Sequence, residues 1–363
     1  MTDYKNLKLI ATSNPHIRGS ETTRSIMLDV IIAMCPALIW AIIYFGVEAL
    51  LLTAVSVVGC VVFEGLYRKL MHKPQSIDDL SAVVTGMLLA FVCPATTPLW
   101  MILIGDFFAI IVVKQLFGGI GKNFANPAIT ARIFLLLCWT GVMTSFVSPI
   151  TLDNGANLFS FFGHAVDTDI SAITSATPLA GVKNSIATGA NPAEGLNALD
   201  MFLGRIGGSA GEVSTLAILI GGVYLLIRRV IDWRIPTLYI GSVVVFTAIF
   251  FANTGYVAQY IWTYLLGGGL MFGAFFMATD YATSPKSCLA VVIYGVGLGF
   301  LTVIFRKFGT MNEGVSFAIL LMNILTPLLD KIMPRVFGAP KKLNVAKLVK
   351  SKNKEVLEGG KND

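Results

Sequence analysis

Apolar stretches long enough to cross a lipid bilayer recur along the whole chain. A helix needs about 20 apolar residues to cross about 30 Å of hydrocarbon. About ten stretches approach this length, and the third one stops early at Cys93-Pro94, as a broken helix would. The stretches are 26–45, 47–66, 80–93, 99–117, 128–147, 214–230, 235–251, 260–279, 289–305 and 315–333. Since only helices and closed barrels satisfy their backbone groups in lipid, this pattern predicts an all-α polytopic membrane protein with about ten transmembrane helices.

The composition excludes several other classes of protein. Hydrophobic residues make up 55% of the chain and charged residues 13%, with a mean hydropathy of +0.75. The charged share is about half that of a soluble globular protein, which excludes a water-soluble enzyme or a disordered chain. The five cysteines are widely spaced and form no Cys-x-x-Cys pair, and the three histidines are scattered. We therefore expect no metal site and no iron–sulfur cluster held by this chain alone.

The positions of the basic residues predict the orientation in the membrane. If the N-terminus is cytoplasmic and each stretch crosses once, most of the 27 Lys and Arg residues lie on the cytoplasmic side. The outer side then holds Lys183, Arg205, Arg306 and Lys307, with Arg306-Lys307 as a local exception. This bias follows the positive-inside rule, and it explains the net charge of +6 without nucleic-acid binding. We expect a multi-pass protein of the cell membrane, with both termini in the cytoplasm.

A weak internal repeat suggests how the chain is organised. The segment GMLLAFVCPAT from Gly86 resembles GLMFGAFFMAT from Gly269, five predicted helices later, so the two copies would run in opposite directions. This predicts two inverted five-helix halves with broken helices at matching places. The expected parts are a cytoplasmic segment 1–25, a first transmembrane half 26–147, an outer-face loop 148–213, a second transmembrane half 214–333 and a basic cytoplasmic tail 334–363.

The first candidate site is a glycine-rich segment, residues 117–128, on the cytoplasmic side. Asn126-Pro127 predicts a helix start, because Asn caps N-termini and Pro suits the first turn. Arg132 follows about one turn later, and helix N-termini attract anions. The alternative is a tight turn between two helices beside a solvated Lys122. The segment has no Gly-Lys-Ser/Thr sequence, so it is not a P-loop.

The second candidate is the outer-face sequence Ser175-Ala176-Thr177-Pro178. A proline disfavours helical backbone at the preceding residue, so the Thr177 hydroxyl is held away from a helix ladder. The small side chains of Ser175 and Ala176 leave space around it. An ordinary Ser/Thr-rich turn is the alternative interpretation.

The third candidate is the group of acidic residues in or beside the apolar stretches. Carboxylates are costly in lipid and often serve ion pathways or pairs there. Asp106 lies deepest, so it is our candidate for an ion pathway, with a structural hydrogen bond as the alternative. The other members of this group are Asp29, Glu48, Glu64, Asp280 and Asp330.

Two motifs together resemble the NqrB/RnfD family. They are KQLFGGIGKNFANPA from Lys114 and, about fifty residues later, TSATPLA from Thr174. The family comprises membrane subunits of the sodium-pumping NADH:quinone reductase and of the Rnf ferredoxin:NAD⁺ oxidoreductase. The resemblance covers almost the whole chain. The lack of a longer N-terminal extension, and Ser-Ala-Thr in place of Ser-Gly-Ala-Thr, make the chain most similar to the RnfD branch of the family.

The resemblance implies a flavin cofactor and a place for it. Family members carry FMN joined through its phosphate to a threonine of the Ser/Thr-x-Ala-Thr motif, which makes Thr177 a phosphoryl-threonine here. Thr174 and Ser175 are rival acceptors. A flavin transferase would install the group on the outer face. The family also implies a second, non-covalent riboflavin-type flavin, for which we select the segment 118–126, with Asn123 and Asn126, together with Arg132.

The expected function is electron transfer between ferredoxin and NAD⁺ coupled to Na⁺ or H⁺ translocation. The chain has no dinucleotide or cluster motif. We therefore assign it no catalytic residue for the overall reaction, which needs partner subunits with iron–sulfur clusters, an NAD site and a second FMN. Two alternatives from other classes stay open: a solute channel or secondary transporter with inverted repeats, and a structural anchor subunit.

Overall fold

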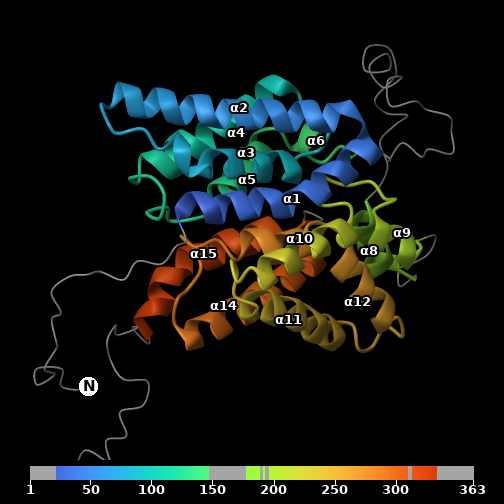
Figure 1. Ribbon diagram of the computed structural model, residues 1–363. Coiled ribbons are helices and arrows are strands. Elements are labelled where there is room, and N and C mark those ends of the chain that lie inside the picture. The colour runs from blue at the N-terminus through green and yellow to red at the C-terminus, as the bar shows by residue number, and fades with distance from the viewer. Residues whose placement is uncertain (1–21, 147–176, 189–190, 193–195, 310–312, 333–363) are drawn as a thin grey trace, which may run out of the picture.

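The computed structural model describes residues 22–146, 177–188, 191–192, 196–309 and 313–332 (Figure 1). Within these residues every regular element is a helix, as predicted. Ser175 and Ala176 lie outside the described part of the chain, as does the rival acceptor Thr174.

The helices fall into two sets along the chain. The first set is α1 (Thr23–Phe45), α2 (Val47–Leu70), the 3₁₀ turn η2 (Ile77–Asp79), α3 (Ser81–Val92), α4 (Leu99–Phe107), its π-helical continuation η3 (Phe108–Gln115), α5 (Pro127–Cys138) and α6 (Thr140–Met143). The second is α8 (Pro178–Thr188), α9 (Ala198–Leu203), α10 (Thr215–Ile227), α11 (Arg234–Phe250), α12 (Val257–Leu266), α13 (Leu270–Phe272) with the π-helical η6 (Gly273–Met277), α14 (Cys288–Phe308) and α15 (Val315–Ile332).

Each predicted apolar stretch contains a helix, but few of these helices are long enough to cross a bilayer alone. By length and apolar composition, α1, α2 and α14 can cross, and α12 with α13–η6 is a fourth candidate bent by 60°. Four shorter apolar helices, α3, α5, α10 and α11, have between 10 and 17 residues. The structure therefore confirms the all-helical membrane class. Among the described residues, length and apolar composition identify three or four helices that can cross the membrane, not ten.

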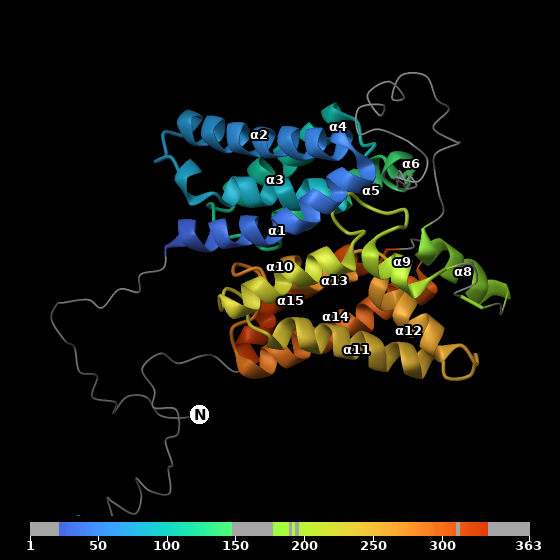
Figure 2. The same ribbon diagram turned by 45° about the vertical axis from the view of Figure 1, so that its right-hand side comes forward.

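The two sets of helices form two packed layers. Figures 1 and 2 show α1 to α6 in one layer and α10 to α15 in the other, with α8 and α9 at one end. The layers meet where α1 packs along α10 and α5 packs along α15. The start of α1 and the end of α15 lie at the end of the molecule opposite to α8 and α9 (Figure 1).

Helix α3 lies at the centre of the first layer. Every residue from Ser81 to Val92 is buried or nearly so, which explains why its sequence is apolar on all sides rather than on one stripe. Gly86 permits this packing, because a side chain there would overlap the backbone of Ser56 and Val57 in α2. The helix ends at Cys93, where the loop before α10 joins it: Ala210 N–H donates to Cys93 O at 3.1 Å and Gly211 N–H to Phe91 O at 2.9 Å.

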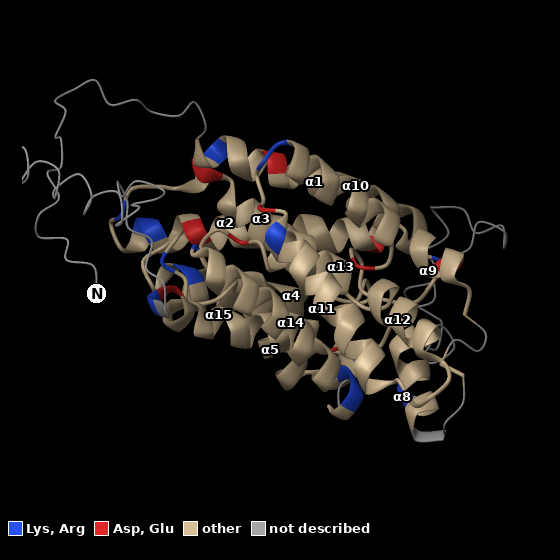
Figure 3. Ribbon diagram, turned by 90° about the horizontal axis from the view of Figure 1, so that it is seen from below, with Lys and Arg blue, Asp and Glu red and all other residues tan. Residues whose placement is uncertain are grey.

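Basic side chains gather at the end of the molecule where α1 begins and α15 ends (Figure 3). The exception predicted at Arg306-Lys307 has a local cause. Arg306 is buried and donates to the carbonyl oxygens of Tyr264 and Gly267, at the C-terminal end of α12. Lys307 donates to the carbonyl oxygen of Phe250, the last residue of α11, at 2.9 Å. Both cations therefore satisfy carbonyl groups that helix ends leave unpaired.

Candidate functional site

Thr177 directly precedes helix α8 and lies in a pocket between several loops. The side chain is buried, and its Oγ1 is 3.4 Å from the N–H of Ala180 while its carbonyl accepts from the same N–H at 2.9 Å. Pro178 occupies the first helical position, where its missing N–H costs nothing. The hydroxyl is thus at the N-terminal end of an 11-residue helix, where a negative group is favoured.

The pocket around Thr177, which we call the outer pocket, has a volume of about 300 Å³. Glycines at positions 207, 208 and 268 line it, and the side chains of Val213 and Leu179 pack against Gly208 and Gly268. Two carboxylates, Glu212 and Glu313, also line it. The remaining lining residues are Pro178, Ile206 and Ser209.

A buried ion cluster forms the inner wall of the outer pocket. Arg132 of α5 has one guanidinium nitrogen 3.6 Å from Glu212 Oε1, and that nitrogen also donates to Ser316 Oγ at 2.6 Å. The other terminal nitrogen binds Glu313. The three charged side chains are between 4% and 15% exposed, so they interact in a medium that screens charge far less than water. We call Arg132, Glu212, Glu313 and Ser316 the Arg132 cluster.

The Arg132 cluster touches the break between α12 and α13. Gly267 to Gly269 separate the two helices, and Gly268 has a φ of +61°, a conformation that glycine adopts without strain. A side chain at Gly269 would overlap the carboxylate of Glu212. The carboxylate therefore faces the N-terminal end of α13, while Arg306 binds the C-terminal end of α12. Each charge has the sign that the adjacent helix dipole favours.

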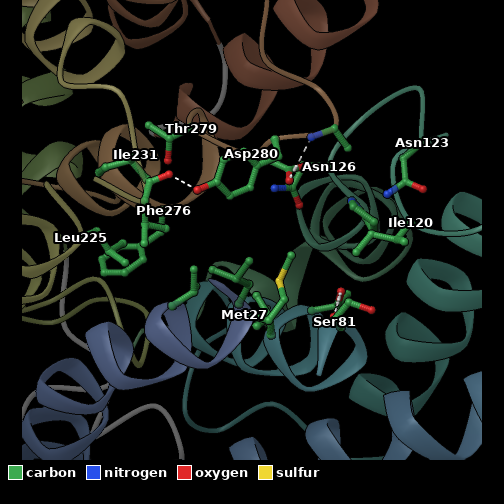
Figure 4. A pocket seen from close by; sticks show the side chains of 18 of the residues that line it. Met27, Ser81, Ile120, Asn123, Asn126, Leu225, Ile231, Phe276, Thr279 and Asp280 are labelled. Carbon is green, nitrogen blue, oxygen red and sulfur yellow. Dashed lines mark hydrogen bonds between the residues drawn. The ribbon is translucent and has the colours of Figure 1, made fainter. Parts of the chain in front are cut away.

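A second pocket, the inner pocket, lies between the two layers near the opposite end. Its space of about 730 Å³, part of which is open to the outside, lies between the glycine-rich segment and helices α1, α3, α10 and η6. Figure 4 shows Asn123 and Ile120 on one side and Phe276 and Leu225 on the other. The Oδ1 atom of Asn123 is buried and has no hydrogen-bond partner among the described residues.

Asn126 also lines the inner pocket, and it starts helix α5 as predicted. Its Oδ1 accepts from the N–H groups of Ala128 and Ile129, at 3.0 and 3.4 Å, with Pro127 at the first helical position. Its Nδ2 is 3.5 Å from Met277 O at the end of η6, so the cap also links the two layers.

Asp280 borders the inner pocket shortly after η6. Burial raises the pKa of its carboxyl group above the ordinary value, opposed by hydrogen bonds from Thr283 Oγ1 and the Ala282 N–H.

The structure divides the residues that the sequence grouped as one flavin site. Asn123 and Asn126 line the inner pocket, whereas Arg132, more than one turn along α5, belongs to the cluster behind Thr177. The inner pocket has a single basic lining residue, Lys114, whose Nζ binds Glu64 Oε2 at 2.7 Å and Ser81 Oγ at 2.8 Å. The pocket thus offers amides and aromatic rings but no free cation among its described lining residues.

Asp106 is fully buried in α4, just before the π-helical segment begins. Its Oδ1 contacts Ser56 Oγ at 2.6 Å and Cys60 Sγ at 3.2 Å, and its Oδ2 has no partner among the described residues. Gly59 is required opposite, since a side chain there would overlap Oδ2. The residue therefore has both a structural hydrogen bond and an unsatisfied oxygen.

Sequence reasoning missed Glu212, Glu313 and Arg306 as parts of one site. Glu212 lies in a polar segment where an acidic residue is usually solvated, and Arg306 lies far along the chain, a separation that no local pattern reveals. The usable signal was the Arg306-Lys307 exception to the predicted charge distribution, since a cation that departs from that distribution needs a specific partner.

These features define a polytopic helical membrane protein with a broken helix, a buried ion cluster at the break and a pocket near each end. The sequence matches the NQR2, RnfD, RnfE family over residues 10–338, and the chain belongs to this family. The resemblance predicted from its two motifs is confirmed.

Relatives cover nearly the same length of chain. The protein is 44% identical to the D subunit of the Na(+)-translocating ferredoxin:NAD(+) oxidoreductase complex of Acetobacterium woodii, over 92% of this chain and 97% of the relative. It is 37% identical to the D subunit of the proton-translocating ferredoxin:NAD(+) oxidoreductase complex of Clostridium ljungdahlii, over 92% and 97%. It is 35% identical to the D subunit of the ion-translocating oxidoreductase complex of Actinobacillus succinogenes, over 90% and 97%.

Proposed function

We propose that this chain is the flavin-carrying membrane subunit of an Rnf-type complex that couples electron transfer between ferredoxin and NAD⁺ to ion translocation. The similarity to D subunits of such complexes over more than nine-tenths of the chain carries this proposal. The partners are then the subunits that hold iron–sulfur clusters, the NAD site and a second FMN. The location is the cell membrane, with the termini in the cytoplasm and α8 on the outer face.

The proposed attachment point is the Thr177 hydroxyl, to which a flavin transferase joins FMN through a phosphoester. Two observations fit this group: a hydroxyl at the N-terminal end of α8, and a pocket around it at the end of the molecule opposite to the start of α1 and the end of α15. A bound flavin supplies one- and two-electron transfer. The chain fixes the tether through α8 and surrounds it with the charges of the Arg132 cluster.

The proposed second flavin is a non-covalent one of the riboflavin type, in the inner pocket. The buried, unpartnered Oδ1 of Asn123 is an acceptor for a polar ring group, and Phe275 and Phe276 supply apolar ring surface. A pocket without a free cation among its described lining residues suits a flavin that lacks a phosphate. Arg132, which the sequence grouped with this site, would instead act near the tether.

The proposed topology has two inverted halves, each containing a broken element near the middle. The α1–α10 and α5–α15 contacts support it, because each would join corresponding helices of the two halves. Helix α3 and the α13–η6 segment, which hold the two copies of the sequence repeat, would then be the matching half-helices. Asp106 is the proposed ion-pathway residue, on the strength of its burial and its unpartnered Oδ2.

The test of the tether uses the purified complex. After denaturing electrophoresis, flavin fluorescence should follow this chain's band and disappear in Thr177→Val. Thr177→Ser, which keeps a hydroxyl, should retain part of it. Undiminished fluorescence in Thr177→Val would remove Thr177 from the proposal and direct attention to Thr174 and Ser175.

A secondary transporter is the competing function, since inverted halves with a central site are typical of that class. Intact-mass measurement separates the two functions. A gain equal to FMN less water supports the flavin subunit, whereas an unmodified chain that moves a solute in vesicles supports the transporter.

A further inference from the structure

One carboxylate oxygen of Glu212 has a cationic neighbour and the other has no partner. Oε1 lies 3.6 Å from the guanidinium of Arg132, whereas Oε2 is buried without a hydrogen bond among the described residues. The residue is 7% exposed. The hydroxyl of Ser209, three positions earlier in the same turn, is also buried without a partner in the described part of the chain. The Ser209 hydroxyl and the Glu212 carboxylate lie near enough to interact with each other, yet neither the hydroxyl oxygen nor Oε2 makes a hydrogen bond of normal geometry with any residue that the structure describes. Two such oxygens on one short turn are unusual, because buried polar atoms are normally paired.

The charges around Glu212 leave it incompletely neutralised. Glu313 binds the same guanidinium, so two carboxylates share Arg132. Arg306, the other nearby cation, is engaged with the carbonyl oxygens of Tyr264 and Gly267. The ionisable groups that face Glu212 from the surrounding elements are Arg132 of α5, Glu313 before α15, Arg306 of α14 and Cys93 at the end of α3. A buried carboxylate without its own counter-charge is unfavourable, and one bound monovalent cation removes the deficit.

A cation bound to Glu212 would lie near both Thr177 and the break between α12 and α13. Glu212 lines the outer pocket together with Thr177, and its carboxylate lies against Gly269 at the break between α12 and α13. A cation on Glu212 would therefore change the charge beside the tether and the charge at the N-terminal end of α13 together.

We propose that Glu212 Oε2, with Ser209 Oγ, binds one exchangeable monovalent cation, either a proton or Na⁺. As a proton site, the carboxylate takes up H⁺ and the new O–H donates to Ser209 Oγ. As a sodium site, both oxygens become ligands of the ion. The relation of this site to flavin and to transport rests on the proposed function, whereas the binding of the cation does not.

Carbodiimide labelling of the full complex in membranes tests the site directly. Dicyclohexylcarbodiimide adds to a protonated, buried carboxyl group and leaves an N-acylurea that peptide mass spectrometry locates. Burial raises the pKa of the Glu212 carboxyl group to about 7. We therefore expect an adduct on Glu212 at about pH 6 that falls roughly tenfold by about pH 8, as the carboxyl group loses its proton. Glu313 is the internal comparison, because it is bound directly to Arg132 and should remain unlabelled.

Replacing KCl by NaCl at constant ionic strength identifies the cation. Protection of Glu212 by Na⁺ assigns the site to sodium, and equal labelling in both salts assigns it to the proton. Glu212→Gln imitates the neutral form, so it should unfold at nearly the wild-type temperature, unlike Glu313→Gln. Absence of a Glu212 adduct at every pH, together with equal destabilisation by the two Gln variants, would make Glu212 a fixed partner of Arg132 and overturn the proposal.

A second measurement connects the site to the tether. In the flavin-loaded complex, Glu212→Gln should flatten the pH dependence of the midpoint potential of the covalent flavin, because the exchangeable charge beside it is gone. If the midpoint potential of the Glu212→Gln variant depends on pH as in the wild type, the cation site does not influence the flavin. If Thr177 carries no flavin, this measurement has no signal while the labelling result stands, so the two failures are distinguishable.

Discussion

The ammonium group of Lys114 lies 2.7 Å from the carboxylate of Glu64, and both side chains are almost completely buried. The pair joins η3 to α2 beside the inner pocket. Ser76 Oγ donates to the same carboxylate at 2.5 Å, Gln115 Nε2 at 3.0 Å, and Lys114 also donates to Ser81 Oγ. Each charge is thus both paired and hydrogen-bonded, the condition under which a buried ion pair is tolerated.

Removing one member of this pair should destabilise the protein strongly. Lys114→Met removes the closer of the two cations beside the buried Glu64 carboxylate and leaves Arg68, whose Nε is 3.7 Å from Glu64 Oε1. The cost in unfolding free energy should therefore be about 3 kcal/mol, the lower end of the range for a broken buried pair. The measurement is thermal unfolding in detergent, and adding Glu64→Gln to the variant should recover part of the loss. As a control, Arg234→Gln removes a half-exposed pair with Asp232 and should cost under about 1 kcal/mol. Equal effects of the two single variants would mean that the Lys114 pair is effectively solvated.

The contact between the two layers depends on a glycine. A side chain at Gly221 of α10 would overlap the backbone carbonyl of Ala33 in α1, and backbone cannot move aside cheaply. Gly221→Ala should therefore lower stability by about 1–3 kcal/mol, the usual cost of overpacking. Gly241→Ala in α11 is the matched control, with nothing within 4 Å of the added methyl group, and should be neutral or slightly stabilising. The measurement is the unfolding temperature of each variant. An unfolding temperature of Gly221→Ala equal to that of the wild type would refute close packing of α1 on α10.

Asn123 should contribute to flavin retention without contributing to stability. Its buried Oδ1 has no partner within the described fold, so Asn123→Ala removes no bond from that oxygen there. The loss of one hydrogen bond to a bound flavin is worth about 1–1.5 kcal/mol, or roughly a tenfold weaker affinity. Released flavin is measured by fluorescence after gel filtration, with Ile120→Val as a control from the same lining. Full retention in Asn123→Ala would exclude this amide from flavin binding.

The cap of α5 gives a separate prediction at Asn126. Asn126→Ala leaves the N–H groups of Ala128 and Ile129 without their acceptor and should cost about 1 kcal/mol in unfolding free energy. Asn126→Asp, which keeps the acceptor, should stay near wild type in a thermal unfolding assay. A loss of the same size in both variants would point to the Met277 contact rather than the cap.

Much of the fold could be predicted from the sequence, because a helix that crosses a lipid bilayer needs about 20 consecutive, mostly apolar residues. The stretch 315–333 was expected as one helix and forms α15, and Asn126-Pro127 was expected to start a helix and does. The break before Leu270 was not located, because its three glycines lie inside a continuous apolar stretch. The approach of Arg132 to Glu212 and Glu313 was also out of reach, since it depends on how the two layers pack rather than on any local pattern.

A substitution at Asp106 can distinguish a structural role of this carboxyl group from a role in the ion pathway. The Ser56 hydroxyl contacts both Asp106 Oδ1 and Gly86 O, yet it carries one hydrogen and can donate to only one of them at a time. Asp106→Asn can instead donate to Ser56 Oγ, so the fold should stay within about 1 kcal/mol of wild type, the worth of one hydrogen bond.

If the carboxyl group carries the ion, Asp106→Asn should reduce ion uptake roughly tenfold or more in vesicles that contain the complex, because an amide cannot exchange a cation. Electron transfer measured in the same vesicles with the membrane potential dissipated reports whether assembly is intact. Glu48→Gln, a partly buried carboxyl at the start of α2, is the matched control and should transport normally. Wild-type uptake by Asp106→Asn would show that this residue serves only to join α4 to α2.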